Sequence, residues 1–465
     1  ITKALSAVLQ LAVTMDYSIF LWNSYNEQRT RCSDNKEAMA DAINETLTSV
    51  VGSSITTIAG FISLCFMSFT MGRDLGIVMA KGVIIGVIVC LTVLPALILC
   101  FDKAIDKTTH KNLIPNLDGL SKKIVKGWPV VLVLFLVLLG PAMYGNSNYE
   151  IYYDIAGALP QSLDSAVANK KLEEKFNMNS THIVLMKNGM ASKEKSEMLK
   201  KIEDVKGVKW ALGIDSFKGV SIPSSMIPKK LESKLKSDNY EIAFVCSDYK
   251  AATDEVNSQI ADINKIVKKY SKDSMVIGEA PLTKDLQDVT DIDLVNVNYV
   301  SVAAIFLIIL ITFKSILIPV ILVMVIEFAI FLNMSVPFYT HESLPFVASI
   351  VIGTIQLGAT VDYAILMTSR YHKERVVRRK SKKEAIDIAH KTSIKSIMIS
   401  GMCLFASTFG VTMSSSIDMI KSICTLLSRG AVISTIVVIL VLPAMLTVFD
   451  KWICKTTWDM RKIDY

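Results

Sequence analysis

The stretch MDYSIFLWNSYNEQ at residues 15–28 occurs a second time in altered form, as VDYAILMTSRYHKE at residues 361–374. Each copy begins inside a long apolar segment and continues past its end. Within the apolar part it carries an aspartate followed by a tyrosine, Asp16-Tyr17 and Asp362-Tyr363. A carboxyl group inside an apolar segment is costly to bury. Its recurrence at matching places therefore indicates a chain built from two related halves.

Further matches extend the repeat in the same order. The offset between the copies grows from 346 residues at the Asp-Tyr pairs to 348 near the end of the repeat. The other matching segments are KEA at 36–38 and 383–385, Lys81-Gly82 and Arg429-Gly430, LP at 94–95 and 442–443, and FDK at 101–103 and 449–451. Order and spacing agree over the whole set, so we interpret the chain as two tandem copies of one helix bundle.

Long uncharged runs separate the charged blocks. The chain is 51% hydrophobic with a mean hydropathy of +0.43, yet 20% of its residues are charged. A run of about 18 or more apolar residues is long enough to cross the hydrocarbon core as a helix. Nine such spans are predicted, near 4–23, 47–71, 75–101, 128–145, 294–313, 315–338, 343–369, 393–415 and 423–449. The fold class predicted is a polytopic α-helical membrane protein.

Basic residues give the orientation. The loop from Arg370 to Lys395 has a large excess of Lys and Arg over Asp and Glu, which predicts that it is cytoplasmic. Counting spans from this loop places the Lys-rich loop 102–127 and the tail 450–465 on the same side. The insertion 146–293, which contains no arginine, then faces outward.

The predicted domains follow from the spans and the repeat. They are 1–101, the last three spans of the first copy; 102–127, a cytoplasmic linker; 128–145, the first span of the second copy; 146–293, an outer domain; 294–449, the last five spans of the second copy; and 450–465, a cytoplasmic tail. If both copies have the same plan, about 220 residues and a second outer domain should precede Ile1, giving twelve spans in all.

The outer domain alternates strand-like and helix-like segments. Strands are predicted at 181–186, 240–246 and 274–277, and helices at 191–205 and 251–270. Two strand-helix-strand units are typical of a small α+β domain of the split βαβ, ferredoxin-like kind. We expect this domain to bind or guide a molecule rather than to perform chemistry.

The Asp-Tyr pairs are the candidate functional residues. A carboxyl group removed from water can take a proton from one side of a membrane and release it to the other, and a neighbouring phenol can exchange hydrogen bonds with it. If the two spans face each other, each aspartate can meet the tyrosine of the other copy. Asp16, Tyr17, Asp362 and Tyr363 are therefore predicted to form a proton relay. A role in helix packing, or a misjudged span end, is the alternative.

Other residues within or next to the spans are assigned separate roles. Glu327 either lines a wet cavity or packs against a polar neighbour such as Asn333. Gly358 is expected to allow a close approach between helices. Lys81 and Arg429 are expected to extend to the outer interface. The pattern at 381–395 predicts an amphipathic basic helix that lies on the inner leaflet.

Composition argues against several classes of function. No Cys/His cluster or CxxC pair suggests a metal or cofactor site, and the single cysteine of the outer domain, Cys246, cannot form a disulfide within it. The basic residues lie next to spans, so the net charge of +7 does not indicate nucleic-acid binding. No catalytic group converges outside the spans, which makes an enzyme the least favoured class.

The sequence resembles the MMPL family within the resistance-nodulation-division (RND) superfamily of proton-driven exporters. The resemblance rests on MDYS at 15–18, GATVDYA at 358–364, SRYHKE at 369–374 and the paired LPA motifs at 94–96 and 442–444. It covers nearly the whole chain. The first copy departs from the family pattern at Ala12, where glycine is expected, and in WNSYNEQ at 22–28.

The resemblance implies an RND-type tandem-repeat bundle in which 146–293 is a porter domain and the Asp-Tyr pairs relay protons. It implies export of lipids or hydrophobic compounds from a bacterial plasma membrane, with membrane lipids, protons and the cargo as partners. Self-association is left open. Two alternatives share the architecture: a non-transporting membrane sensor of the sterol-sensing kind, and a protein-export accessory of the SecDF kind.

Overall fold

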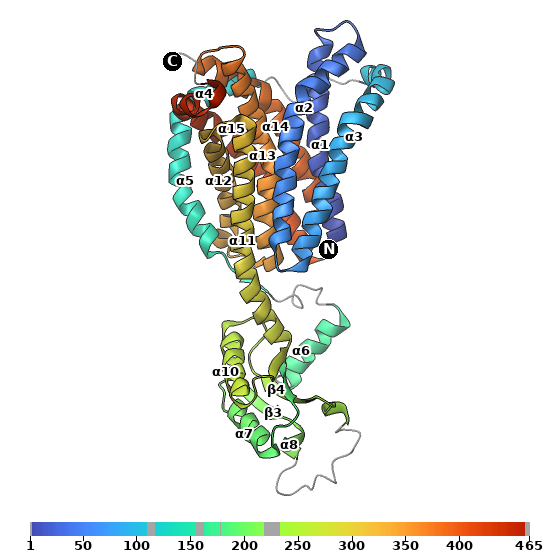
Figure 1. Ribbon diagram of the computed structural model, residues 1–465, viewed down its shortest axis with the longest axis vertical. Coiled ribbons are helices and arrows are strands. Elements are labelled where there is room, and N and C mark those ends of the chain that lie inside the picture. The colour runs from blue at the N-terminus through green and yellow to red at the C-terminus, as the bar shows by residue number, and fades with distance from the viewer. Residues whose placement is uncertain (1, 109–116, 154–161, 177, 218–232, 461–465) are drawn as a thin grey trace. The chain divides into compact units, whose positions relative to one another are not determined.

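The computed structural model describes residues 2–108, 117–153, 162–176, 178–217 and 233–460. The chain divides into two compact units (Figure 1). Unit 1 comprises residues 1–151 and 292–465, and unit 2 comprises residues 152–291. Residues 109–116 of the predicted linker and 461–465 of the predicted tail lie outside the described residues.

Unit 1 consists of long helices. They are α1 (Thr2–Arg29), α2 (Asn35–Ser63), η1 (Leu64–Phe66), α3 (Thr70–Thr108), α4 (Asp118–Lys126), α5 (Trp128–Asn148), the later part of α11 (Glu279–Phe313), α12 (Leu317–Thr340), α13 (Phe346–Val376), α14 (Lys382–Ser414), α15 (Asp418–Thr456) and η3 (Trp458–Met460). Two short strands, β1 (Ile151–Tyr152) and β6 (Leu344–Pro345), form a separate two-stranded sheet.

The chain is a mostly helical, multi-pass membrane protein. Among the described residues, seven helices are long and apolar enough to cross a membrane, and an eighth is added if the bent segment 35–66 counts as one span. The predicted span 4–23 is occupied by a helix, α1, but α1 is not one of these. The prediction of a separate interfacial helix at 381–395 is wrong. Helix α14 begins at Lys382 and continues through these residues into the span without a break.

Helices of each repeat copy also pack against helices of the other copy. Helix α2 packs against α1 of its own copy and also against α13 of the other, while α14 packs against α13 and also against α1. Figure 1 shows α1, α2, α13 and α14 within one bundle. An ion pair joins the copies as well, with Lys373 Nζ on α13 lying 2.6 Å from Glu45 Oε1 on α2.

The predicted cytoplasmic ends of the two copies hold equivalent polar clusters. In the second copy, Tyr371 donates a hydrogen bond of 2.5 Å to Asp450, and an Nη2 of Arg375 lies 3.1 Å from the same carboxylate. In the first copy Tyr25 donates to Asp102 at 3.1 Å, and Arg29 lies 3.5 Å from it. Each cluster ties the helix with the Asp-Tyr pair to the last helix of its copy.

Unit 2 contains a four-stranded antiparallel sheet. Its strands are β2 (Ser180–Lys187), β3 (Val208–Leu212), β4 (Tyr240–Ser247) and β5 (Met275–Gly278), in the spatial order β3-β4-β2-β5. The helices are α6 (Asp164–Phe176), α7 (Ser192–Glu203), α8 (Ile214–Phe217) and α10 (Asp254–Tyr270). Residues from β2, β4, α7 and α10 form a continuous apolar core.

Three of the four strands lie where the sequence predicts them, but β3 was not predicted. Its sequence VKWAL has polar and apolar residues in irregular order, and it pairs with β4 through a shift in register between Val208 and Trp210. Strand β5 ends at Gly278, which has φ +135°. A Cβ there would lie 3.1 Å from the Thr181 carbonyl oxygen, so this corner between β5 and α11 requires glycine.

The buried histidine of β2 should make unit 2 sensitive to acid. His182 is fully buried, its Nε2 lies 3.3 Å from Gln259 Oε1, and burial lowers its pKa below the ordinary 6.5. The unfolded chain then binds more protons than the folded one, so the stabilisation from neutral His182 is present above the unfolded pKa and is lost as pH falls toward the folded pKa. We expect amide protection in β2 and β4 to decrease below about pH 6.5.

Hydrogen exchange measured by mass spectrometry, corrected for the intrinsic effect of pH, tests this prediction. The variant His182→Gln should flatten the pH dependence of protection. His341→Asn, at an exposed histidine of unit 1, should leave it unchanged. The same pH dependence in wild type and His182→Gln would show that another group is responsible.

Candidate proton-relay site

Both Asp-Tyr pairs are buried inside unit 1. Asp16 is 4% exposed and Asp362 is 2% exposed, while Tyr17 and Tyr363 are fully buried. The first pair lies on α1 and the second on α13. Neither aspartate is at a helix end.

Hydroxyl groups of α2 surround Asp362. The Thr57 hydroxyl lies 3.2 Å from Oδ2 and 3.4 Å from Oδ1, and it also lies 3.0 Å from the Gly358 carbonyl oxygen. Ser53 and Thr56, on the same helix, lie near this carboxyl group. The Thr56 hydroxyl donates to the Ser53 carbonyl oxygen at 2.6 Å, and Ser53 Oγ has no hydrogen-bond partner among the described residues. A carboxylate that accepts hydrogen bonds is favoured in its charged form. The Thr57 hydroxyl can therefore offset part of the cost of ionising Asp362 away from water.

The surroundings of Asp16 are related to those of Asp362 but are less polar. Ser400 of α14 faces Asp16, and it stands 347 residues after Ser53, the same offset as the matching KEA segments. Within the described part of the chain, Asp16 Oδ1 has no hydrogen-bond partner, and neither does Ser400 Oγ. The copies thus place a serine hydroxyl near each aspartate, and Asp362 has the Thr57 hydroxyl as a donor in addition.

The four residues come together across the two copies. Asp362 lies within electrostatic range of Tyr17, and Asp16 lies within range of Tyr363. The two aspartates also lie within range of each other. Neither phenol oxygen has a hydrogen-bond partner among the described residues. Two carboxyl groups and two phenols therefore share one buried region.

Close contact between glycines brings α2 and α13 together here. A Cβ on Gly60 would lie 3.2 Å from the Gly358 Cα, and a Cβ on Gly358 would lie 3.6 Å from the Thr57 carbonyl oxygen. Small residues allow helix backbones to approach closely in a membrane. Gly358 thus sits where α13 meets the hydroxyl-bearing face of α2, one turn before Asp362.

Glu327 lies apart from the Asp-Tyr pairs. It lines a pocket of about 340 Å³ bordered by α5, α11, α12 and α13, together with polar residues that include Asn146, Asn298 and Thr354. Its Oε1 has no hydrogen-bond partner in the described ranges. Glu327 therefore lines a cavity, and no hydrogen bond joins it to Asn333 among the described residues.

Asn333 instead belongs to a network with Arg429. Asn333 donates to Gln356 at 2.8 Å and to the Leu426 carbonyl oxygen at 3.0 Å. Arg429 Nε donates to Asn333 Oδ1 at 2.8 Å, and its Nη2 donates to the Asn333 carbonyl oxygen at 2.9 Å. The prediction that Arg429 extends to the interface is therefore wrong, because α12 offers it buried acceptors. Lys81 is exposed, and its role stays a prediction.

Sequence reasoning missed the hydroxyls of the site. The run SSITT at 53–57 is polar for the middle of a span, and its offset of 347 residues from Ser400 was available in the sequence. For metals, no group of three or more His, Cys, Asp or Glu side chains within the described residues could hold an ion.

Comparison with known proteins places the chain in a family. The family model described as "MMPL family" matches residues 1–133 and 157–463. The chain is 22% identical over 305 residues to "Probable transport protein MmpL2" of Mycobacterium tuberculosis, covering 62% of this chain and 31% of that protein. It is 22% identical over 511 aligned positions to the "Apo-petrobactin exporter" of Bacillus anthracis, covering 99% of this chain and 65% of that protein.

A third relative matches a shorter part. The "Siderophore exporter MmpL5" of Mycobacterium tuberculosis is 30% identical over 141 residues, which are 30% of this chain and 14% of that protein. The chain spans less than two thirds of the length of each of these three relatives. The family match covers most of the chain, so the protein belongs to the MMPL family of membrane transporters, whose members are not enzymes.

Proposed function

We propose that the protein is an exporter of lipids or hydrophobic compounds that is driven by inward proton flow, with Asp16, Tyr17, Asp362 and Tyr363 as the proton relay. The observation that carries the proposal is the meeting of two buried Asp-Tyr pairs from two copies of one repeat. Ionisable groups inside a membrane bundle are expensive and often mark proton paths.

The geometry suits a change of protonation during transport. Asp362 has the Thr57 hydroxyl of α2 as a donor that stabilises its charged form, whereas Asp16 Oδ1 has no partner among the described residues. Two carboxyl groups within electrostatic range favour holding one proton between them over being charged together. A shift of α2 or α14 would alter the hydroxyls around each acid and so could couple proton uptake to movement of the bundle.

The tandem repeat supports alternating access. Helices α1, α2 and α3 correspond to α13, α14 and α15, and parallel repeats with sites at their interface are a common transporter construction. In unit 2, β4 lies between β3 and β2, so the two βαβ units are split as in a ferredoxin-like domain. We assign unit 2 the role of a porter domain that receives cargo outside the membrane.

The cargo class has a second candidate. Two relatives bear names that describe export of a siderophore or of apo-petrobactin, and one of them aligns with 99% of this chain. A polar iron chelator is therefore a candidate beside lipids. The pocket that contains Glu327 has both polar and apolar lining residues, so it would suit a cargo that carries hydroxyl or amine groups on an apolar frame.

Comparison of surface and secreted molecules tests both the transport and its cargo. A deletion strain and a complemented strain would be compared by mass spectrometry of extracted lipids and of culture-medium chelators. We expect one compound to be depleted outside the deletion cells and retained within them. In complemented cells a protonophore should abolish its export, while ATP depletion with the gradient maintained should not.

A sensor would give a different result. Its deletion would change gene expression or lipid composition without trapping one compound inside, and the effect of complementation would survive the protonophore. Export that continues at full rate without a proton gradient would contradict the proposed function.

A further inference from the structure

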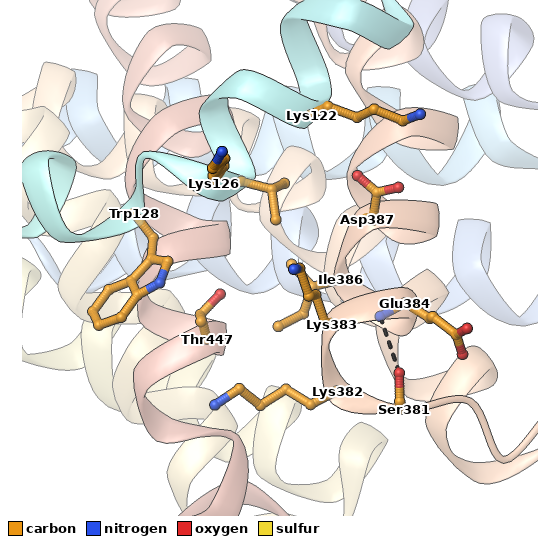
Figure 2. Close-up of a pocket in the computed structure, with 11 residues that line it drawn as sticks. Lys122, Lys126, Trp128, Ser381, Lys382, Lys383, Glu384, Ile386, Asp387 and Thr447 are labelled. Carbon is orange, nitrogen blue, oxygen red and sulfur yellow. Dashed lines mark hydrogen bonds between the residues drawn. The ribbon is translucent and has the colours of Figure 1, made fainter.

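A basic pocket lies in unit 1, apart from the Asp-Tyr pairs, at the predicted cytoplasmic end. It has a volume of about 690 Å³ and is lined by residues of α4, the start of α5, the start of α14, and α15. Figure 2 shows its side chains, with Lys382 extending from α14 toward Thr447 of α15. The charged residues that line it are Lys122, Lys126, Lys382, Lys383, Glu384 and Asp387.

The walls of the pocket are joined by a buried histidine. His390 of α14 is fully buried, its Nδ1 lies 2.7 Å from the Ser121 hydroxyl of α4, and its Nε2 lies 3.0 Å from the Ile439 carbonyl oxygen of α15. An ion pair of 2.7 Å between Lys391 and Asp118 adds a second link between α14 and α4. Short helix α4 is thus fixed against the bundle, and the pocket is a built feature.

The four lysines of the pocket have no carboxylate partner among the residues that the structure describes. No ion pair within the described ranges connects Lys122, Lys126, Lys382 or Lys383 to a carboxylate, although Lys391 close by is paired with Asp118. The two acids of the pocket leave an excess of positive charge. The pocket also lies at the N-terminus of α14, where the helix dipole favours an anion. These charges fit a ligand with a phosphate group.

The pocket adjoins an apolar surface of the bundle. Trp128 lines it at the first position of α5, and tryptophan is enriched at membrane interfaces. The next turns of α5 expose Val130 at 73%, Val133 at 61% and Val137 at 63%. A ligand whose phosphate meets the lysines can therefore lay acyl chains along α5, which a free phosphate cannot do.

We propose that this pocket binds the headgroup of an anionic phospholipid of the inner leaflet. The lysine ammonium groups bind the phosphate, Trp128 lies at the level of the glycerol backbone, and the acyl chains contact the exposed side of α5. Basic pockets between membrane helices on the cytoplasmic side have the chemistry that such headgroups require. The proposal rests on the membrane location of the protein and on the predicted cytoplasmic side of this end, and it does not depend on proton-driven export.

Native mass spectrometry of the intact, delipidated protein in detergent tests the site. Phosphatidylglycerol and phosphatidylcholine with identical acyl chains would be titrated separately. We expect one phosphatidylglycerol to bind preferentially, and the joint variant Lys122→Ala, Lys126→Ala, Lys382→Ala and Lys383→Ala to lower its affinity by at least about tenfold.

A matched control removes four lysines elsewhere on the same side. Lys36, Lys103, Lys107 and Lys455 are exposed and have no ion pair with a described residue, so replacing them with Ala removes the same charge. This control should keep the preferential binding. The smaller change Lys126→Gln with Lys382→Gln should give an intermediate loss, which guards against a folding defect in the joint variant.

Three results would overturn the proposal. They are equal affinity for phosphatidylcholine, an equal loss of affinity in the control and in the joint variant, and full displacement of phosphatidylglycerol by glycerol phosphate. The last result would assign the pocket to a soluble phosphate compound, because such a competitor has no acyl chains to place along α5.

Discussion

Export by the intact protein is expected to fall to background when Asp362 is replaced by asparagine. Asparagine keeps the shape of the side chain and can still accept a hydrogen bond from Thr57, but it cannot bind and release a proton. The same result is expected for Asp16→Asn, because a relay shared by the two copies fails when either acid is lost. The compound to follow is the one that accumulates inside the deletion cells. The measurement is the rate at which this compound appears outside cells that produce each variant.

Controls separate the loss of a proton site from the loss of folding. Each variant should be present in the membrane at the wild-type amount and should unfold in detergent at or above the wild-type temperature, because a buried carboxyl group is removed. Asp106→Asn, at a carboxylate whose side chain is 52% exposed on α3, should export normally. Undiminished export by both Asp16→Asn and Asp362→Asn would exclude the proposed relay.

The largest loss of stability is expected from Arg375→Met. Arg375 and Asp450 are 5% and 3% exposed, and the guanidinium is the only cation that forms an ion pair with Asp450 among the described residues. Removing one partner of a buried ion pair costs about 3–5 kcal/mol because it leaves a buried charge uncompensated. We expect a lower unfolding temperature in detergent and less protein in the membrane.

The first copy supplies the matched control. Arg29 occupies the equivalent position, but its side chain is 26% exposed and its closest carboxylate, Asp106, is 52% exposed. Exposed ion pairs contribute about 1 kcal/mol or less. Asp102 also keeps hydrogen bonds from Tyr25 and Asn35 when Arg29 is lost. Similar losses from Arg29→Met and Arg375→Met would show that burial does not determine the effect.

The repeat made much of this arrangement predictable from sequence. Long apolar runs gave the helices, and the offset of the copies brought Asp16 and Asp362 to equivalent positions. The same offsets relate Tyr25 to Tyr371 and Asp102 to Asp450, so the two end clusters could have been found by asking which polar residues recur together. A repeat exposes such pairs because the same local chemistry is required in each copy.

Contacts between the copies were harder to predict. Periodicity shows which face of a helix is apolar, but it does not show which helix covers that face. The position of Thr57 beside Asp362 depends on α2 packing across the copies, and the binding of Arg429 by Asn333 depends on where α12 lies. Strand β3 depends on pairing with β4, since its own alternation of polar and apolar residues is weak.

The packing of α2 and α14 across the two copies also has a consequence for biosynthesis. The ribosome completes α1 long before it reaches α14, which carries the Ser400 that faces Asp16. During that interval Asp16 lacks one of the helices that cover it, and α2 lacks α13. The early helices must therefore wait in the insertion machinery or in a loosely packed state. The buried acidic site can therefore close only after α14 has been made.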